Sequence, residues 1–315
     1  MNRTRFLLNL VAGLALGALG TGILSAQSVP AGSGVPARMV VTEETSQSTG
    51  MPVIGAEDVI VSERQQRDKV TGWVPAQGKY AGLELYILLD DGSTSSLATQ
   101  LGDIRQFILE QPSSAKIGLA YMRNGIAWIA QTPTSDHELT AKALRVPMGI
   151  RGANGSPYFS LTDLLKRWPK SDTRREVLMI SDGIDRYYDE ADMLDPYLAE
   201  AIEKAQRAGV VVSAIYNPGV GDFGQGDWRR FIGQTYLAQV AQKTGGKAYY
   251  IGFNAPAVSF APYLRDFADR LNHQYLLSFL AEPVKKAGLE PVGLATEAAN
   301  AELVAADRVY VPAGR

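Results

Sequence analysis

Apolar runs of two kinds alternate through the middle of the sequence. Residues 85–89 form a continuous apolar run of the kind found in a parallel strand that is buried on both faces. After this run, Leu97, Leu101, Ile104 and Ile108 recur at helical spacing. They predict an amphipathic helix that packs its apolar side against the preceding strand.

The same alternation continues to residue 273. Arg123-Asn124-Gly125 separates two strand patterns and predicts a hairpin, because Asn-Gly favours a tight turn. We predict strands at residues 116–121, 126–130, 176–180, 210–216 and 248–251, and helices at 136–144, 194–208, 231–244 and 260–273, with one more helix ending at residue 168. Repeated strand and helix units predict an α/β fold with a doubly wound, mostly parallel, Rossmann-like sheet and helices on both faces. In such a sheet, ligands bind at the carboxyl ends of the strands.

Short strand patterns also lie outside this alternation, at both ends of the chain. They cover residues 58–61, 70–74, 274–280, 289–296 and 308–311. These strands could pair with one another or extend the edge of the main sheet. We therefore divide the chain into a signal peptide (1–26), a flexible leader (27–56), an N-terminal β extension (57–79), the α/β domain (80–275) and a C-terminal β tail (276–315). The leader is rich in Pro, Gly, Ser and Thr.

The first 26 residues resemble an export signal. Arg3 and Arg5 precede a mainly apolar stretch, residues 6–24, and Ser25-Ala26 offers a small-residue cleavage edge. We expect an exported protein of the periplasm, the cell surface or the medium. Membrane attachment is expected only if this segment stays uncleaved.

Composition narrows the classes of function. Of 315 residues, 46% are hydrophobic and 20% charged, which is typical of a globular fold. Two of the 31 basic residues and none of the 33 acidic residues lie in residues 1–26, so the mature chain has a net charge near −4 and is a poor nucleic-acid binder. The chain has no cysteine, which excludes disulfides and thiolate metal sites. We interpret its two histidines, His137 and His273, as surface or packing residues.

The strand at residues 85–89 leads directly into an oxygen-rich turn. Asp91, Ser93 and Ser95 form the pattern D-x-S-x-S, a set of hard oxygen donors that suits Mg²⁺ or Mn²⁺. Two further loops are expected at the same edge of the sheet. One carries Ser156 and the other carries Asp182, which follows the strand at 176–180.

These three loops together resemble those of the von Willebrand factor type A domain, over about residues 80–275. In that family, D-x-S-x-S after the first strand, a threonine loop and an Asp-Gly after the fourth strand build a metal-ion-dependent adhesion site. The resemblance implies that Asp91, Ser93, Ser95, Ser156 and Asp182 bind Mg²⁺, or Mn²⁺ or Ca²⁺, directly or through water. It also implies that an Asp or Glu of a protein partner completes the coordination. Ser156 departs from the family's threonine, and its freer rotamer predicts a looser site.

Two alternatives at this turn stay open. Asp90 could be the functional acid in place of Asp91, with a poorer set of donors at Gly92 and Thr94. Ser, Asp and Asp-Gly are also favoured in turns and helix caps without any metal.

The loops that follow Asp182 and residue 216 carry side chains typical of protein interfaces. The predicted partner-binding rim consists of Tyr187, Tyr188, Phe223, Trp228, Arg229 and Arg230. The alternative is a connector whose Trp228 packs on the helix that follows.

The leading hypothesis is an exported, non-enzymatic adhesion or interaction module that grips an acidic residue of a partner through a divalent cation. A first alternative is a metal-free assembly module that uses its edge strands, at 57–74 and 274–311, to bind a neighbour. A metal-assisted hydrolase is the weaker alternative, because only Asp182 or Asp90 could act as its base and no nucleophile, phosphate-loop or zinc motif occurs.

Overall fold

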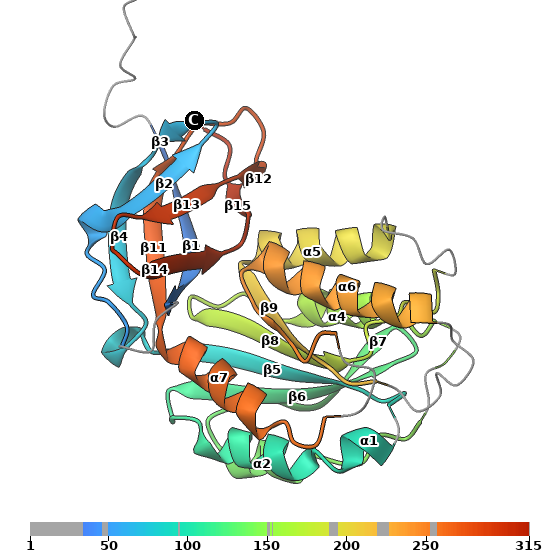
Figure 1. Cartoon of the computed structure of the whole chain (residues 1–315). Helices are drawn as coiled ribbons and strands as arrows, with labels where there is room; N and C mark the ends of the chain where they lie inside the picture. The colour runs from blue at the N-terminus through green and yellow to red at the C-terminus, as the bar shows by residue number, and fades with distance from the viewer. Residues whose placement is uncertain are drawn as a thin grey trace, which may run out of the picture. The chain divides into compact units, whose positions relative to one another are not determined.

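The computed structural model describes residues 34–45, 50–93, 95–149, 152, 154–188, 195–218, 227–252 and 257–314 (Figure 1). The predicted signal peptide, residues 1–26, lies outside this range. Within the described residues no helix is both long and apolar enough to span a membrane.

The central sheet has six strands in the order β10 (Ala248–Tyr249), β9 (Val210–Tyr216), β8 (Arg174–Ser181), β5 (Leu83–Asp90), β6 (Ala115–Arg123) and β7 (Ile126–Thr134). All neighbouring pairs are parallel except β6 and β7, which form the predicted hairpin. The chain proceeds outward from β5 to β7, then returns to the other side of β5 at β8. This confirms the doubly wound sheet and places its topological switch point between β5 and β8.

Helices cover both faces of this sheet (Figure 1). Helices α2 (Leu101–Glu110), α3 (His137–Lys142) and α7 (Ala261–Asn272) bury residues in one core, and α4 (Pro157–Arg167), α5 (Pro196–Ala208) and α6 (Asp227–Thr244) bury residues in the other. A short helix, α1 (Ser95–Ala98), follows β5.

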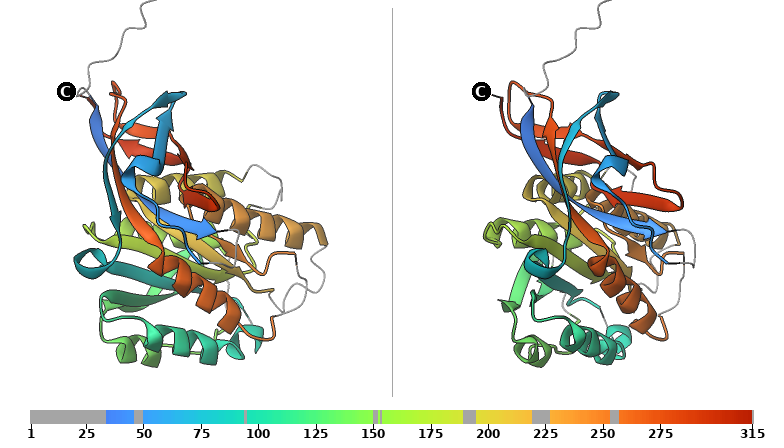
Figure 2. Two further views of the ribbon diagram at one scale, coloured as in Figure 1. Left: turned by 60° about the vertical axis from the view of Figure 1, so that its left-hand side comes forward. Right: turned by 90° about the vertical axis from the view of Figure 1, so that its left-hand side faces the viewer.

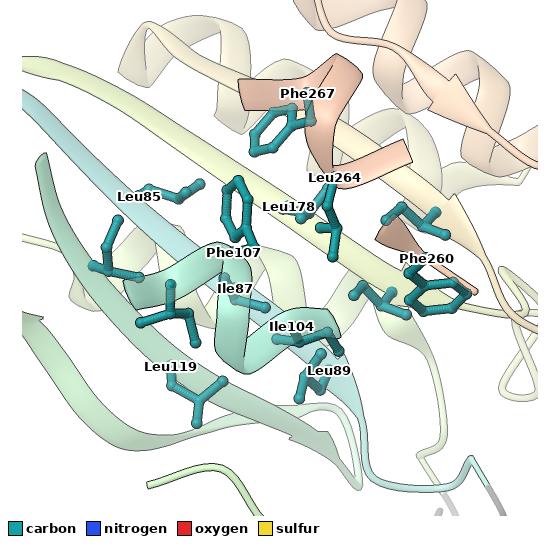
Figure 3. Packing of buried hydrophobic residues seen from close by; sticks show 14 of the residues in the cluster. Leu85, Ile87, Leu89, Ile104, Phe107, Leu119, Leu178, Phe260, Leu264 and Phe267 are labelled. Carbon is teal, nitrogen blue, oxygen red and sulfur yellow. The ribbon is translucent and has the colours of Figure 1, made fainter. Parts of the chain in front are cut away.

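Alternation along β5 divides its side chains between the two cores. Leu85, Ile87 and Leu89 pack with Ile104 and Phe107 of α2 (Figure 3), whereas Tyr86 and Leu88 pack with residues of α4. Successive strand residues point to opposite faces. Asp90, the last residue of β5, therefore belongs to the α4 face, and Asp91 belongs to the α2 face.

The remaining strands form small sheets around a third core. One sheet has the order β14 (Ala301–Ala305), β1 (Val35–Thr45), β11 (Gln274–Ala281) and β4 (Lys69–Pro75). A second consists of β13 (Gly293–Thr296), β2 (Val59–Glu63) and β3 (Gln66–Arg67), and a pair consists of β12 (Gly288–Pro291) and β15 (Arg308–Val311). Two 3₁₀ turns, η1 (Ala56–Asp58) and η2 (Gly78–Tyr80), lie between these strands in the chain. Strands from the two ends of the chain, blue and red in Figure 2, lie side by side.

Strand β1 corrects the expectation of a flexible leader at residues 27–56. Residues 35–45 pair with β11 along one edge and with β14 along the other, and Val41 is fully buried. The composition of residues 27–56 gives no sign of this strand. The strand is defined by pairing with β11 and β14, which lie more than 200 residues away in the sequence. Strands β2 and β4 pair with β13 and β11, so the N-terminal extension does pair with the C-terminal tail.

A buried polar network links β8, β11 and β1. The side chain of Gln274, the first residue of β11, accepts a hydrogen bond from Arg174 and donates to Glu176 and Thr42. Arg174 also donates to Leu271 O at 2.9 Å. Burial raises the pKa of Glu176 to about 7, against the lowering effects of the Gln274 hydrogen bond and the Arg174 charge.

We predict that Glu176 makes the protein less stable as the pH rises from 5 to 7. The ordinary pKa of a glutamate is 4.5, so in this range the folded state retains a proton that the unfolded state has lost. The stabilisation is complete below pH 4.5 and is lost as the pH approaches 7, at up to about 1 kcal/mol per pH unit. The free energy of unfolding, measured with urea between pH 5 and 8, should depend less steeply on pH for Glu176→Gln than for the wild type. Glu110→Gln, on the exposed side of α2, is the matched control; equal slopes for Glu176→Gln and the wild type would contradict the prediction.

Candidate binding site at the carboxyl edge of the sheet

The carboxyl ends of β5 and β8 meet at the switch point, and the three oxygen-bearing loops lie there. Ser181, the last residue of β8, donates from Oγ to Asp90 Oδ2 at 3.1 Å. The backbone N–H of Gly92 donates to the other oxygen of Asp90 at 2.8 Å. Asp90 is thus held between the two strand ends on the α4 face of the sheet.

Asp91 lies on the other face and binds an arginine. Its carboxylate is fully buried and receives Arg145 Nη1 on Oδ1 at 2.6 Å and Nη2 on Oδ2 at 2.9 Å. The backbone N–H of Met148 adds a bond to Oδ1 at 2.9 Å. Arg145 is itself fixed, because its guanidinium lies 3.9 Å from the ring centroid of Tyr121. The hydrogen bond to Asp91 raises the pKa of Arg145 above its usual value.

Asp182 forms a second pair of the same kind. Arg186, four residues later, places Nη2 at 2.5 Å from Oδ2 and Nη1 at 3.2 Å from Oδ1. Arg186 Nη1 also donates to Ile184 O, and the Ile184 N–H donates to Asp182 Oδ1. Both side chains are largely buried, so this pair is shielded from solvent.

Ser156 serves as a helix cap and contacts a further acid. Its Oγ accepts from the backbone N–H groups of Tyr158 and Phe159 at the start of α4, and donates to Asp185 Oδ2 at 2.6 Å. The other oxygen of Asp185 accepts from the N–H groups of Tyr187 and Tyr188. Ser156 therefore caps α4, as expected of a serine at a helix start.

The two remaining predicted donors are less fully defined. Ser93 is buried, and Asn217 Nδ2, just beyond β9, donates to its Oγ at 3.4 Å. Ser95 is the first residue of α1, and its side chain lies outside the described part of the structure.

A small pocket at this edge brings together residues of three loops. Its lining consists of Asp90, Met122, Arg123, Asn124, Gly125, Gly155, Ser156, Pro157, Ser160 and Arg186. Asp90, and not Asp91, shares the pocket with Ser156. Asp90 is the acid with which the alternative register begins.

The four predicted ligands whose side chains the structure describes, Asp91, Ser93, Ser156 and Asp182, do not fit a divalent cation in this arrangement. Mg²⁺ requires near-octahedral coordination by oxygens. Here both oxygens of Asp91 and both oxygens of Asp182 already accept from a guanidinium. Two arginines would repel a cation placed among these groups. In the described part of the chain, moreover, no three acidic or histidine side chains are grouped closely enough to hold a metal.

Sequence reasoning missed the arginines and two nearby acids. The spacing of Asp182 and Arg186, four residues apart, is a signal that could have found one pair. Arg145 lies 54 residues from Asp91 and carries no local signal. Asp195 caps α5 through the N–H groups of Tyr197 and Leu198, and burial together with the nearby Asp185 raises its pKa to about 6.

The predicted rim is partly exposed. Tyr187 and Trp228 are about half exposed, and Trp228 stacks on Phe231 with a centroid distance of 5.6 Å. Tyr188 packs edge-on against Tyr197. Arg229 lines a small pocket with Asp185, and Arg230 forms an ion pair with Asp227. Phe223 lies outside the described residues.

Further exposed apolar side chains at this edge were not predicted. Trp128 and Ile126 lie where β7 leaves the hairpin turn, and Val146 and Met148 lie in the loop that contacts Asp91. Each is about half exposed. Together with Tyr187, Trp228 and Phe231, they form what we call the apolar rim.

The comparisons with known proteins give matches of structure only. No family model and no curated protein matches the sequence. Among solved structures, the chain is similar to an aerotolerance-related membrane protein from Bacteroides fragilis, with 14% identity, a TM-score of 0.44 and coverage of 61% of this chain and 99% of that one. It is also similar to the vWF domain of the type V pili tip protein Mfa5 from Porphyromonas gingivalis, with 11% identity, a TM-score of 0.40 and coverage of 61% and 95%. A third is the SpRpn10 VWA domain, with 13% identity, a TM-score of 0.38 and coverage of 58% and 94%.

The order of the strands and loops agrees with the sequence resemblance to the von Willebrand factor type A domain. The D-x-S-x-S turn follows β5, the first strand of the central sheet, and the Asp-Gly turn follows β8, its fourth strand in chain order. The antiparallel hairpin of β6 and β7 lies between them. This is the arrangement that the sequence resemblance implies.

Helix α6 packs unusually close to the Asp182-Gly183 turn. Gly183 has a φ of +71°, and a Cβ on it would lie 2.2 Å from Gly233 O. A Cβ on Gly233, in α6, would lie 2.4 Å from Asp182 O. Both glycines are therefore required for the helix and the turn to approach each other.

We predict that Gly233→Ala lowers the free energy of unfolding by about 2–4 kcal/mol, because the added methyl group forces α6 away from the turn. Gly102→Ala, near the start of α2, is the matched control, because nothing lies within 4 Å of its Cβ position. Alanine there should be neutral or stabilise by up to about 1 kcal/mol. Chemical unfolding of both variants measures the difference, and equal effects would show that the close approach is not a constraint.

Proposed function

We propose that this chain is a non-enzymatic protein-interaction module that binds its partner at the carboxyl edge of the central sheet. The observation that carries the proposal is the apolar rim of half-exposed side chains at the edge where the carboxylates and hydroxyl of Asp91, Asp182 and Ser156 form a buried, hydrogen-bonded set, which we call the polar floor. Exposed aromatic side chains grouped on a rigid base are typical of binding surfaces.

The partner we propose presents an Asp or Glu. Several arginines stand at the same edge. Arg123 lies against the ring of Trp128 and lines the pocket, Arg145 has a partly exposed guanidinium, and Arg229 lies next to the Tyr188 loop. Guanidinium groups bind carboxylates in a well-defined geometry. Export by the predicted signal at residues 1–26 would place this edge in the periplasm, at the cell surface or outside the cell.

Hydrolysis is disfavoured by the bonding of the two acids that could act as a base. Asp90 accepts bonds from Ser181 and Gly92, and Asp182 is held by Arg186. A general base must be placed to accept a proton from the reacting group. Both carboxylates are instead engaged within the chain.

The assembly alternative also has less support. Strand β2, which it would offer to a neighbour, lies between β13 and β3 of the same chain, and β4 pairs with β11 along one of its two edges. Side chains of both strands also pack in the third core. The proposed interaction does not depend on the divalent cation that the sequence resemblance implies.

Site-specific photo-crosslinking in the cells that make the protein tests the proposal. A photoreactive benzoylphenylalanine at Tyr187 or at Trp228 should give one discrete crosslinked species of the same mass, because both lie on the apolar rim. The matched control is Tyr80, which has a comparable exposed fraction but lies just before β5, at the amino end of the sheet.

A further substitution links the crosslink to the rim. Phe231→Ala should reduce the yield from Tyr187 several-fold without changing the melting midpoint, because Phe231 is about half exposed. The proposal fails if Tyr187 and Trp228 yield no species beyond those seen from Tyr80.

A further inference from the structure

We propose that Arg145 and Arg186 take the place of a divalent cation at this edge, so that the edge assembles, and meets an acidic partner, without metal. The part that concerns the partner rests on the proposed function. The part that concerns the metal rests on the contacts of Asp91 and Asp182 alone.

The two guanidinium groups carry the same total positive charge as one divalent ion. One divalent ion would bring two positive charges to the two carboxylates of the predicted set. Arg145 and Arg186 bring one each, and each binds both oxygens of one carboxylate. Asp91 and Asp182 have side-chain exposures of 0% and 2%. A carboxylate buried to this extent needs a counter-charge with good geometry, and bidentate arginine supplies it.

Both guanidinium groups are held in place by groups other than their carboxylates. Arg145 lies over the Tyr121 ring and donates to Val146 O, while Tyr121 Oη accepts from the Arg145 backbone N–H at 2.8 Å. Arg186 donates to Ile184 O. A metal would therefore have to displace two anchored side chains, and would leave their positive charges close to the ion.

One of these arginines lines the small pocket at this edge. Arg186 lines it together with Asp90 and Ser156. The hydroxyl of Ser156 is directed to Asp185, and the carboxylate of Asp182 to Arg186. Arg186 and its bonds to Asp182 therefore lie beside Ser156, at the edge where the family resemblance implies an ion.

The first test is thermal unfolding of the full chain after EDTA treatment, with and without 5 mM Mg²⁺, Mn²⁺ or Ca²⁺. An ion that binds only the folded state raises the melting midpoint by mass action. We expect no ion to shift the midpoint by more than about 1 °C, whereas occupancy of a folded site would shift it by several degrees. A rise of that size with any of the three ions overturns the inference.

The second test is a double-mutant cycle on Asp182 and Arg186. Arg186→Gln should lower the midpoint strongly, because it leaves a buried charge without its partner. Adding Asp182→Asn should restore most of the loss, since the amide still accepts from the Ile184 N–H without a charge. Additive losses overturn the role of Arg186 as the counter-charge. If Arg186→Gln alone does not fold, folding of the double variant reports the same coupling and its failure overturns it.

The chain offers a matched control for this cycle. Glu203 and Arg207 form an ion pair with the same spacing of four residues, but both side chains are about half exposed. Glu203→Gln and Arg207→Gln should therefore show little coupling. Coupling as large as that of Asp182 and Arg186 would mean that burial is not what makes the arginine necessary.

Crosslinking from Tyr187 separates the two proposals. We expect the same yield in EDTA and in 5 mM Mg²⁺. A crosslink that requires the metal leaves the proposed function standing and overturns the present inference. Absence of any crosslink removes the proposed function, while the unfolding experiments still decide whether arginine replaces the ion.

Discussion

A carboxylate buried at the end of a strand needs a counter-charge, and this requirement shapes the carboxyl edge of the sheet. Asp91 and Asp182 stand at the ends of the two central strands, almost without access to water. The loop from α3 to α4 approaches β5 because Arg145 and Met148 both bond to Asp91. The loop after β8 turns back on itself because Arg186 bonds to Asp182. The path of each loop thus follows from the charge that it satisfies.

The alternation of side chains along β5 determines which loop each of the two acids, Asp90 and Asp91, contacts. Leu88 packs on the α4 face and Leu89 on the α2 face, so that Asp90 and Asp91 diverge although they are adjacent. Asp90 then reaches Ser181 and the pocket of Ser156, whereas Asp91 reaches Arg145. The D-x-S-x-S pattern begins at Asp91. Because successive residues of the strand point to opposite faces, however, it is Asp90 that lines the pocket together with Ser156.

Much of the fold could be predicted from the sequence because its signals are local. The apolar run at residues 85–89, the helical spacing after it and the Asn-Gly turn each lie within about a dozen residues. Strand β1 could not be found in this way, since its partners β11 and β14 are far away in the chain. The same limit applies to the site. Its acids and hydroxyls were visible as short motifs, while the Arg145 pairing depends on a contact across 54 residues.

At this edge the charged groups are buried and the apolar side chains are exposed, so the two sets of side chains have different roles. The carboxylates on the floor are held by bonds that burial strengthens, so the floor contributes rigidity and a defined shape. The rim carries Trp128, Met148 and Trp228, whose half-exposed side chains lose water when a partner covers them. In the proposed interaction, affinity would come mainly from the rim, and the arginines would contribute orientation and selection of charge. A floor held by arginine, as proposed, would be indifferent to the supply of divalent ions, and the chain would then present the same surface with or without them.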